Sequence, residues 1–266
     1  MGFRDQLTGH IPDNLLSCLH GHYDVIGSVA VLSVPACLED YRQVIADALL
    51  SHRHSIKTVL NKIASVDGSS RTARYEILSG EETVTTCREY GSEYRLDVLT
   101  SFFNPRLGTE RNRVTGQVLS GERVLVPFAG VGPFVVPAAA RGARVVAIEQ
   151  NPDAFFWLLE NIRKNNAGDR VSAIMGDAFD TSLLPATAFD RVIIPTPYGM
   201  DAILPVLEPH VKPGGMVHFY SFQNAGQACN LRDALGQRGY DVVLVRKCGN
   251  VAPGIARWVF DLRKRS

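Results

Sequence analysis

The sequence predicts an α/β protein in which a parallel-sheet domain, residues 119–266, follows a small α+β domain, residues 1–100. Short apolar runs such as 124–126 alternate with helical stretches in the second half, a pattern typical of parallel strands covered on both faces. The N-terminal part instead holds β-rich stretches separated by glycine-containing turns. Residues 101–118 are predicted to link the two domains.

The predicted elements of the small domain follow from local composition and spacing. Apolar residues at helical spacing mark its main helix, and β-branched or aromatic residues mark its strands. In chain order these are a helical lead at 11–16, a strand with a glycine bulge at 23–32, a helix at 38–52, and strands at 58–60, 72–78, 83–90 and 94–98, with a turn at 67–68.

The second domain alternates strands and helices, as a parallel sheet requires. A Pro-Gly-Gly turn precedes one of its central strands, and two long β-rich stretches end the chain. Its predicted elements are strands at 124–126, 144–148, 171–175, 190–194 and 216–222, helices at 134–141, 152–164, 204–210 and 225–239, and a closing antiparallel hairpin at 240–247 and 256–262.

Length and composition exclude several classes of protein. A chain of 266 residues can bury a full core, and its 45% hydrophobic and 21% charged content are those of a soluble globular protein. No apolar run approaches the roughly 20 residues that span a membrane. The first residues also lack the basic and apolar regions of a signal peptide. We therefore expect a cytoplasmic protein without a membrane partner.

Cysteine, histidine and charge patterns narrow the chemistry. The five cysteines are scattered without a CxxC or Cys/His cluster, and the seven histidines show no zinc spacing, so reduced thiols and no metal site are expected. The net charge is only +1, and residues 1–115 carry 12 Lys/Arg against 14 Asp/Glu. Composition alone thus does not indicate a polynucleotide substrate, although this charge balance is compatible with a local basic patch.

A glycine turn lies between the strand at 124–126 and the helix that follows it. The turn reads Phe128-Ala129-Gly130-Val131-Gly132, and about 20 residues later the next strand ends on Glu149. In a nucleotide-binding βαβ unit, glycines allow close approach of the ligand, and such an acid binds the ribose hydroxyls. A tight turn with a purely structural role is the alternative.

The ligand expected at this turn carries a ribose without a pyrophosphate. The third glycine of the dinucleotide fingerprint is missing, and Pro133 cannot donate a backbone N–H to a phosphate. S-adenosylmethionine (SAM) is therefore the candidate cofactor.

Further candidates follow the third and fourth strands, because parallel sheets bind ligands beyond their strand ends. Asp177 is expected to accept a hydrogen bond from the adenine amino group, while the Ala178 N–H meets a ring nitrogen. A solvated acid at a strand end is the alternative for Glu149 and Asp177. The fourth strand exits at 195–198, where the transferred group is expected to meet its acceptor.

The linker is rich in arginine. Arg106, Arg111 and Arg113 stand close to two aromatic residues, a combination suited to an anionic or planar ligand. The alternative is a solvated helix start, with Thr109 capping a helix that begins at Glu110.

Several motifs together resemble one family, the archaeal and eukaryotic tRNA guanine-37 N1-methyltransferases and the related wybutosine-pathway aminocarboxypropyltransferases. The motifs span most of the chain: DVIG at 24–27, Arg71-Thr72, Glu76-Leu78-Gly80-Glu81, Leu96-Asp97, FNPRLGTER at 103–111, FAGVGPF at 128–134 and APG at 252–254. The resemblance implies an RNA-facing domain ahead of a class I, Rossmann-like SAM-binding domain, with tRNA as partner. We expect the protein to lack the additional domain by which many of the methyltransferases reach the tRNA elbow, as the aminocarboxypropyltransferases do.

The resemblance also implies roles for single residues. Arg106 corresponds to the arginine that the methyltransferases use near the guanine oxygen, where a cation stabilises negative charge. Their Asn-Leu-Pro signature reads Pro195-Thr196-Pro197 here, so only Pro197 is kept. Val126 replaces an Asp near the amino acid end of SAM, which weakens ammonium recognition.

These arguments assign Arg106 and Pro197 to catalysis. The general base is not evident, and Glu110 is a weak candidate. Residues 128–132, Glu149, Asp177, Ala178 and Pro195 are expected to bind SAM, and Arg106, Arg111, Thr196 and Tyr198 to bind the substrate.

The leading hypothesis is methyl transfer from SAM to a nitrogen of a purine in tRNA. The alternatives are transfer of the 3-amino-3-carboxypropyl group of SAM to a wybutosine precursor, and a methyltransferase directed at a protein side chain or small molecule. A binding protein without catalysis is the non-enzymatic alternative.

Overall fold

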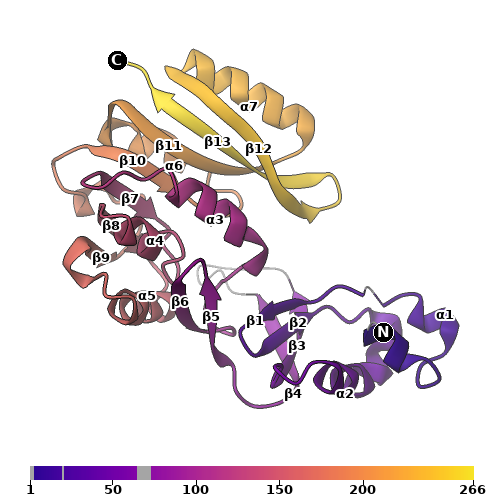
Figure 1. The fold of residues 1–266 in the computed structure, drawn as a ribbon. Helices are drawn as coiled ribbons and strands as arrows, with labels where there is room; N and C mark the ends of the chain where they lie inside the picture. Colours follow the sequence, from indigo (N-terminus) through magenta and orange to yellow (C-terminus); the bar gives the residue numbers. More distant parts are fainter. Residues whose placement is uncertain (1–2, 20, 65–72) are drawn as a thin grey trace. The chain divides into compact units, whose positions relative to one another are not determined.

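A computed structural model describes residues 3–19, 21–64 and 73–266, and the chain forms two compact units, Met1–Arg106 and Leu107–Ser266 (Figure 1). The boundary between the units falls inside the predicted linker, residues 101–118. The predicted turn at 67–68 and the Arg71-Thr72 motif lie outside the described residues.

The first unit contains a four-stranded sheet, in the order β1-β2-β3-β4 among the described residues, and a separate β5–β6 hairpin. Helix α2 packs its buried residues, such as Ile45 and Leu49, into the core of this unit. Its strands are β1 (Asp24–Ile26), β2 (Val29–Leu32), β3 (Thr58–Ala64), β4 (Arg74–Ser79), β5 (Val84–Glu89) and β6 (Ser92–Asp97). Its helices are η1 (Phe3–Leu7), α1 (Asp13–Leu16), η2 (Ala36–Tyr41), α2 (Arg42–His52) and η3 (Pro105–Leu107).

The predicted single strand at 23–32 is wrong, because the chain forms a hairpin there. Ile26 of β1 pairs with Val29 of β2, so only Gly27 and Ser28 make the turn. Gly27 has φ +57, a conformation that glycine adopts without strain, and a Cβ there would collide with Thr85 Oγ1. The glycine thus reverses the chain and lets β1 approach β5.

The second unit has a seven-stranded sheet in the order β12-β13-β11-β10-β7-β8-β9 among the described residues. Five strands are parallel, and β13 runs antiparallel between β11 and β12. This is the predicted Rossmann-like sheet with its closing hairpin. The strands are β7 (Arg123–Pro127), β8 (Arg144–Glu149), β9 (Val171–Met175), β10 (Phe189–Ile194), β11 (Val211–Gln223), β12 (Tyr240–Ala252) and β13 (Ile255–Lys264).

Helices cover both faces of this sheet, and α7 is seen on one side of it in Figure 1. Residues of α3, α4 and α5 share one apolar cluster with β7 and β8, and residues of α6 and α7 share the other with β10 and β11. The helices are α3 (Gly108–Thr115), α4 (Val135–Ala140), α5 (Pro152–Lys164), α6 (Ile203–Leu207) and α7 (Ala225–Gln237), with short 3-10 turns η4 (Gly168–Arg170), η5 (Thr181–Leu183) and η6 (Glu208–His210).

One predicted cap is wrong. Helix α3 begins at Gly108 with Leu107 at its N-cap position, so Thr109 lies within the first turn. The predicted start at Glu110 was displaced because residues 105–107 already turn in a 3-10 helix that runs directly into α3.

Candidate active site

The loop between β7 and α4 has an unusual backbone. Phe128, Gly130 and Gly132 all lie in the left-handed region, with φ values of 55, 55 and 94°. Glycine adopts this conformation freely, whereas Phe128 is strained by it. Backbone strain of this kind concentrates at ligand-binding loops, where the surrounding structure holds it in place.

Glu149 joins this loop to the end of β8. Its Oε2 accepts the Gly130 N–H at 2.7 Å, and its Oε1 accepts the Asn151 N–H at 2.8 Å. A Cβ built on Gly130 meets no heavy atom within 4 Å, so the space above this residue is open. The acid and the glycine turn, 19 residues apart, therefore meet at one edge of the sheet.

Helix α5 contacts this loop through two of its residues. Asn161 is fully buried and donates from Nδ2 to the Val131 carbonyl oxygen at 2.9 Å. A Cβ on Gly132 would lie 2.9 Å from Leu158 Cδ1, so this glycine permits close packing of loop and helix. Sequence reasoning missed Asn161; the available signal was an amide on the apolar face of α5, three residues after Leu158.

The predicted adenine-binding residues follow the adjacent strand, β9. Asp177 is exposed and its Oδ1 accepts the Phe179 N–H at 3.0 Å, while Ala178 is buried in a cluster that includes Ile148. The Phe179 ring meets the Phe128 ring edge-on at 6.4 Å. The structure thus brings the ends of β7, β8 and β9 together through direct contacts.

The residues that follow β10 differ in their solvent exposure. Thr196 is 1% exposed, and its hydroxyl donates back to the Ile194 carbonyl oxygen at 3.2 Å. Pro195 and Pro197 are half-buried, whereas Tyr198 is 72% exposed. Of the predicted substrate contacts at this exit, Tyr198 is the one displayed to solvent, and the contact through Thr196 stays a prediction.

Val126 occupies the apolar interior of the sheet. It is fully buried and belongs to the same cluster as Ala147 and Ile193. An isolated carboxylate at this depth carries a large desolvation cost. Val126 itself therefore offers packing and no ammonium partner.

The predicted arginines divide between the two units. Arg106 belongs to the first, where its side chain is 64% exposed and its Nε donates to Asp24 Oδ1 at 2.6 Å. Arg111 and Arg113 belong to α3 in the second, and Arg111 is 4% exposed. The alternative of a fully solvated helix start is wrong for these two, because Arg111 is buried and Arg113 is partly buried.

Arg113 enters a buried ionic network that sequence reasoning missed. It donates to both oxygens of Glu110, at 2.7 and 2.9 Å, and to Asp261 at 2.6 Å. Burial works to lower the pKa of Arg113, but the two carboxylates raise it above its ordinary value. Tyr220 also donates to Glu110 at 3.1 Å. Glu110, the weak candidate for the base, is thus held by cationic and hydroxyl partners.

His218 continues this network across the sheet. Its Nδ1 lies 2.7 Å from Asp261 Oδ1, and its Nε2 lies 2.6 Å from an amino group of Arg191. Because Arg191 only donates, Nε2 must accept and Nδ1 must carry the proton. Burial lowers the pKa of His218, so the ring is neutral. His218 is thus a buried histidine with both ring nitrogens hydrogen-bonded.

Family models match nearly the whole chain. The model described as the TRM5/TYW2 methyltransferase domain covers residues 85–232, and that described as the TYW2 N-terminal domain covers residues 3–83. The chain belongs to the TRM5/TYW2 family. The resemblance drawn from the motifs at 103–111 and 128–134 is confirmed.

Two TRM5/TYW2 relatives carry different names. The chain is 34% identical over 218 residues to the tRNA (guanine(37)-N(1))-methyltransferase Trm5b of Pyrococcus abyssi. The aligned residues cover 82% of this chain and 64% of that protein. It is 32% identical over 269 residues to the tRNA(Phe) (4-demethylwyosine(37)-C(7)) aminocarboxypropyltransferase of Pyrococcus horikoshii, covering 98% and 95%. The chain thus spans less than two thirds of the first relative.

Solved TRM5/TYW2 structures share the fold. The complex of aTrm5 with tRNALeu superposes with a TM-score of 0.89 at 25% identity, covering 100% of this chain and 78% of that one. TYW2 of P. horikoshii in complex with MeSAdo gives a TM-score of 0.80 at 30% identity, covering 99% and 98%. The predicted class I, Rossmann-like fold with a small N-terminal domain is confirmed.

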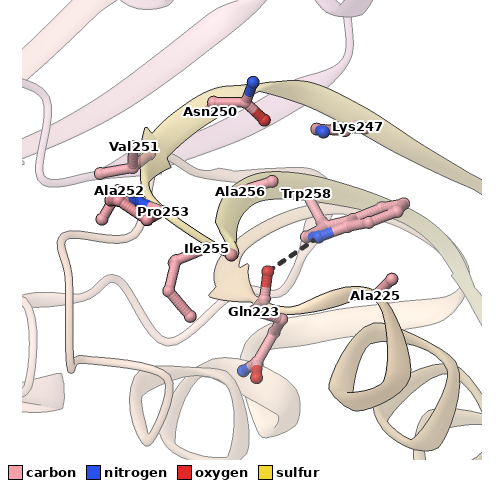
Figure 2. Close-up of a pocket in the computed structure, with 11 residues that line it drawn as sticks. Gln223, Ala225, Lys247, Asn250, Val251, Ala252, Pro253, Ile255, Ala256 and Trp258 are labelled. Carbon is pink, nitrogen blue, oxygen red and sulfur yellow. Dashed lines mark hydrogen bonds between the residues drawn. The ribbon is translucent and has the colours of Figure 1, made fainter.

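This TRM5/TYW2 chain also has a cavity of about 540 Å³ where the β12–β13 hairpin passes the start of α7 (Figure 2). The cavity is lined by Lys247, Asn250 and Trp258, and the Trp258 indole donates to the Gln223 carbonyl oxygen at 3.1 Å. None of its lining residues belongs to the glycine loop. It is therefore separate from the site built around Glu149.

No group of three or more His, Cys, Asp or Glu side chains is placed to hold a metal ion in the part of the chain that the structure describes. No helix within residues 3–19, 21–64 and 73–266 is long and apolar enough to cross a membrane. A cytoplasmic location stays a prediction.

Proposed function

We propose that this chain binds SAM and transfers its methyl group to a nitrogen of a purine in tRNA. The observation that carries the proposal is the Glu149 carboxylate, bonded to the Gly130 N–H beneath open space at the end of β8. A carboxylate offers about four acceptor sites, more than the two backbone amides of Gly130 and Asn151 fill, and can therefore also accept from ribose hydroxyls. A strained, glycine-containing loop beside such an acid fits a nucleoside cofactor.

Structural neighbours support the choice of cofactor. TYW2 of M. jannaschii is described in complex with AdoMet, and TYW2 of P. horikoshii in complex with MeSAdo. The chain's own residues fit the adenosine part of such a ligand: Glu149 for the ribose, and Asp177 and the Ala178 N–H for the adenine. The sulfonium of SAM supplies an electrophilic methyl group that a purine nitrogen attacks.

The relatives support tRNA as the acceptor. The P. abyssi relative is named for guanine 37 of tRNA, and the aTrm5 structure is a complex with tRNALeu. In the proposed reaction the purine nitrogen first gives its proton to a base. It then forms a bond to the methyl carbon while the carbon–sulfur bond breaks and leaves its electron pair on sulfur. Arg106 is proposed to stabilise the negative charge that this proton loss leaves on the purine. Pro197 and Thr196 are proposed to shape the exit at which the acceptor enters.

Transfer of the 3-amino-3-carboxypropyl group is the second candidate, and a specific observation favours it. Residues 3–83 match the TYW2 N-terminal domain, and the chain spans 95% of the P. horikoshii aminocarboxypropyltransferase. In this reaction the bond from sulfur to the aminocarboxypropyl chain breaks instead of the bond to the methyl group.

The by-product separates the two reactions. Methyl transfer leaves S-adenosylhomocysteine, whereas aminocarboxypropyl transfer leaves methylthioadenosine. Purified protein is incubated with SAM and either unmodified tRNA or tRNA carrying 4-demethylwyosine, and both by-products are quantified by mass spectrometry. S-adenosylhomocysteine formed with unmodified tRNA supports the first proposal, and methylthioadenosine formed with the modified tRNA supports the second. Turnover only with protein or metabolite fractions contradicts both.

Arg106 has a matched control in its own unit. Arg88 is also an exposed arginine paired with one carboxylate, Glu93, at 2.8 Å. Arg106→Ala is expected to reduce turnover about 100-fold, as the loss of a charge-stabilising group does, with SAM affinity unchanged. Arg88→Ala, which removes an equal charge, is expected to keep turnover within about twofold. Equal losses in both variants contradict a specific role for Arg106.

A further inference from the structure

An aromatic pair lies at the carboxyl end of β11. The rings of Tyr198 and Phe222 meet edge-on with centroids 5.5 Å apart, and the Tyr198 side chain is 72% exposed. A large aromatic group displayed in this way on a fixed neighbour is suited to stacking a base, since every base has a π-face. Packing against Phe222 restrains the Tyr198 ring, which lowers the entropy lost on binding.

A guanidinium lies beside the pair. Arg257 in β13 is the register partner of Phe222, and its Cζ lies 4.8 Å from the centre of the Phe222 ring. Among the described residues, no carboxylate pairs with Arg257. Burial lowers the pKa of Arg257, and the like charge of Arg111 nearby acts in the same direction. A partly buried guanidinium without a carboxylate partner, close to the buried Arg111, favours an anionic ligand.

The position of this cluster fits an acceptor. Tyr198 follows β10, and Phe222 is the penultimate residue of β11, at the same edge of the sheet as the glycine loop after β7. Because β11 is two strands from β7, and neighbouring strands are about 4.8 Å apart, roughly 10 Å separates the two strand ends. This distance corresponds to one to two nucleotides of RNA.

We propose that Tyr198, Phe222 and Arg257 form a nucleotide subsite in which Tyr198 stacks one base of the RNA acceptor and Arg257 pairs with a phosphate. The inference rests on the proposed function for its choice of RNA. A planar base combined with a phosphate matches both halves of the cluster, whereas the carboxylate of SAM would need Arg257 alone and would leave the exposed Tyr198 ring unused.

The test measures RNA binding rather than turnover. The probe is an anticodon stem-loop RNA with 2-aminopurine at the position equivalent to guanine 37, titrated in the presence of saturating S-adenosylhomocysteine. Stacking on Tyr198 is expected to quench the fluorescence of the probe. SAM affinity is measured separately by calorimetry, and thermal melting checks that each variant folds.

Each substitution has a matched control in the same unit. Tyr198→Ala is compared with Phe156→Ala, which removes another exposed aromatic ring in an edge-on pair, with Trp157. Arg257→Gln is compared with Arg263→Gln, an exposed arginine of the same strand, about 20 Å away at 3.4 Å per residue.

The expected results differ between the two variants. Tyr198→Ala weakens binding of the probe about tenfold and abolishes the quenching, as loss of one stacked base does. Arg257→Gln also weakens binding, and it reduces the slope of log affinity against log salt by about 0.7, as loss of one phosphate contact does. Arg257→Lys restores that slope because it keeps the charge. Both control variants and all SAM affinities stay within about twofold of wild type.

Other outcomes overturn the subsite. Unchanged affinity and quenching in Tyr198→Ala contradict stacking of a base on this ring. A loss of SAM affinity in Arg257→Gln would show that Arg257 binds the carboxylate of SAM instead of an RNA phosphate. The two proposals fail separately. If wild-type protein shows no turnover but its quenching depends on Tyr198, the subsite stands and the proposed reaction fails. If turnover occurs and all variants bind the probe alike, the reaction stands and the subsite fails.

Discussion

The two halves of one sheet edge, proposed to bind the cofactor and the acceptor, are built by different means. The half formed by the ends of β7, β8 and β9 uses backbone: two left-handed glycines, amide groups and a single carboxylate, Glu149. The half formed by β10, β11 and β13 uses side chains from separate elements, namely Tyr198, Phe222 and Arg257.

This difference separates a half that tolerates few substitutions from a half that can change its ligand. The backbone half depends on glycine φ values and close packing, which few substitutions tolerate. The side-chain half can change its acceptor without altering the sheet, because the exposed Tyr198 lies in the loop after β10, and loops tolerate substitution. Pro195 and Thr196, which depart from the signature of the methyltransferases, lie in the variable half. The predictions below test the division, and substitutions in one half should leave the ligand of the other half bound.

The largest effect is expected at Gly132. Gly132→Ala places a Cβ 2.9 Å from Leu158 Cδ1 at φ +94, so the loop must move away from α5. SAM affinity should fall at least about 100-fold, because small displacements of a positioning loop are costly. Calorimetry measures this loss. Gly121→Ala is the control, since φ there is +85 but a Cβ meets nothing within 4 Å. Equal losses in both variants would show that strain alone, without the contact to α5, explains the effect.

Glu149→Gln is expected to have the next largest effect. The side-chain nitrogen of Gln donates and cannot accept, so only one of the Gly130 and Asn151 N–H groups keeps its acceptor. The negative charge of the carboxylate is also lost. A charge-assisted hydrogen bond contributes about 1.5–3 kcal/mol, which corresponds to a 10- to 150-fold loss of SAM affinity. Glu160→Gln on α5 is the control. Binding of the RNA probe should be unchanged, and a parallel loss of RNA affinity would contradict the separation of the two halves.

The ionic network beneath the side-chain half should make this unit sensitive to acid. The pKa of His218 is lowered by burial, while Asp261, Arg191 and Arg113 face its ring or its partner. Below pH 6.5 the unfolded state therefore binds a proton that the folded state does not. The free energy of unfolding should fall by up to about 1.4 kcal/mol per pH unit as the pH drops from 6.5 towards the folded pKa.

Denaturant unfolding at pH 5.0 to 8.0 measures this dependence. His218→Asn, which keeps a donor near Asp261, should remove the slope between pH 6.5 and 5.5. His210→Asn, at a half-buried position outside the network, should retain it. A slope that persists in His218→Asn would assign the acid sensitivity to other groups.

The smallest effect is expected at Asp201, near the exit of β10. Its Oδ2 accepts from Ser221 at 2.9 Å and from Gln223 at 3.3 Å, while its buried Oδ1 has no partner among the described residues. Burial raises the pKa of Asp201, so ionisation costs stability above an unfolded pKa of about 3.9.

Asp201→Asn keeps an acceptor for Ser221 and removes the buried charge. The free energy of unfolding at pH 7.5 should stay unchanged or rise by about 1 kcal/mol, and its fall between pH 4 and 6 should become shallower. Asp169→Asn, at an exposed position, should change neither quantity. A loss of several kcal/mol in Asp201→Asn would show that the ionised carboxylate is needed for the fold.

Sequence periodicity predicted the sheet and its order of elements, and a few local errors show what it misses. Composition does not distinguish the hairpin at Gly27 from the predicted bulge, because both place a glycine inside a β-rich run and the pairing of Ile26 with Val29 leaves no mark in composition. The helix start at Gly108 depended on a preceding 3-10 turn rather than on a capping side chain.

The amino-acid sequence alone predicted the half that we propose binds the cofactor, because its elements are local: the glycine turn, the strand that follows and Glu149 lie within 25 residues, in one βαβ unit. Only the tertiary structure decided the rest. The Asn161 bond to the loop, the network from Glu110 to His218, and the contacts of Phe222 with Tyr198 and Arg257 all join residues that are far apart in the chain. Side-chain sites of this kind leave no spacing in the sequence, since the sheet order, and not the chain order, makes their members neighbours.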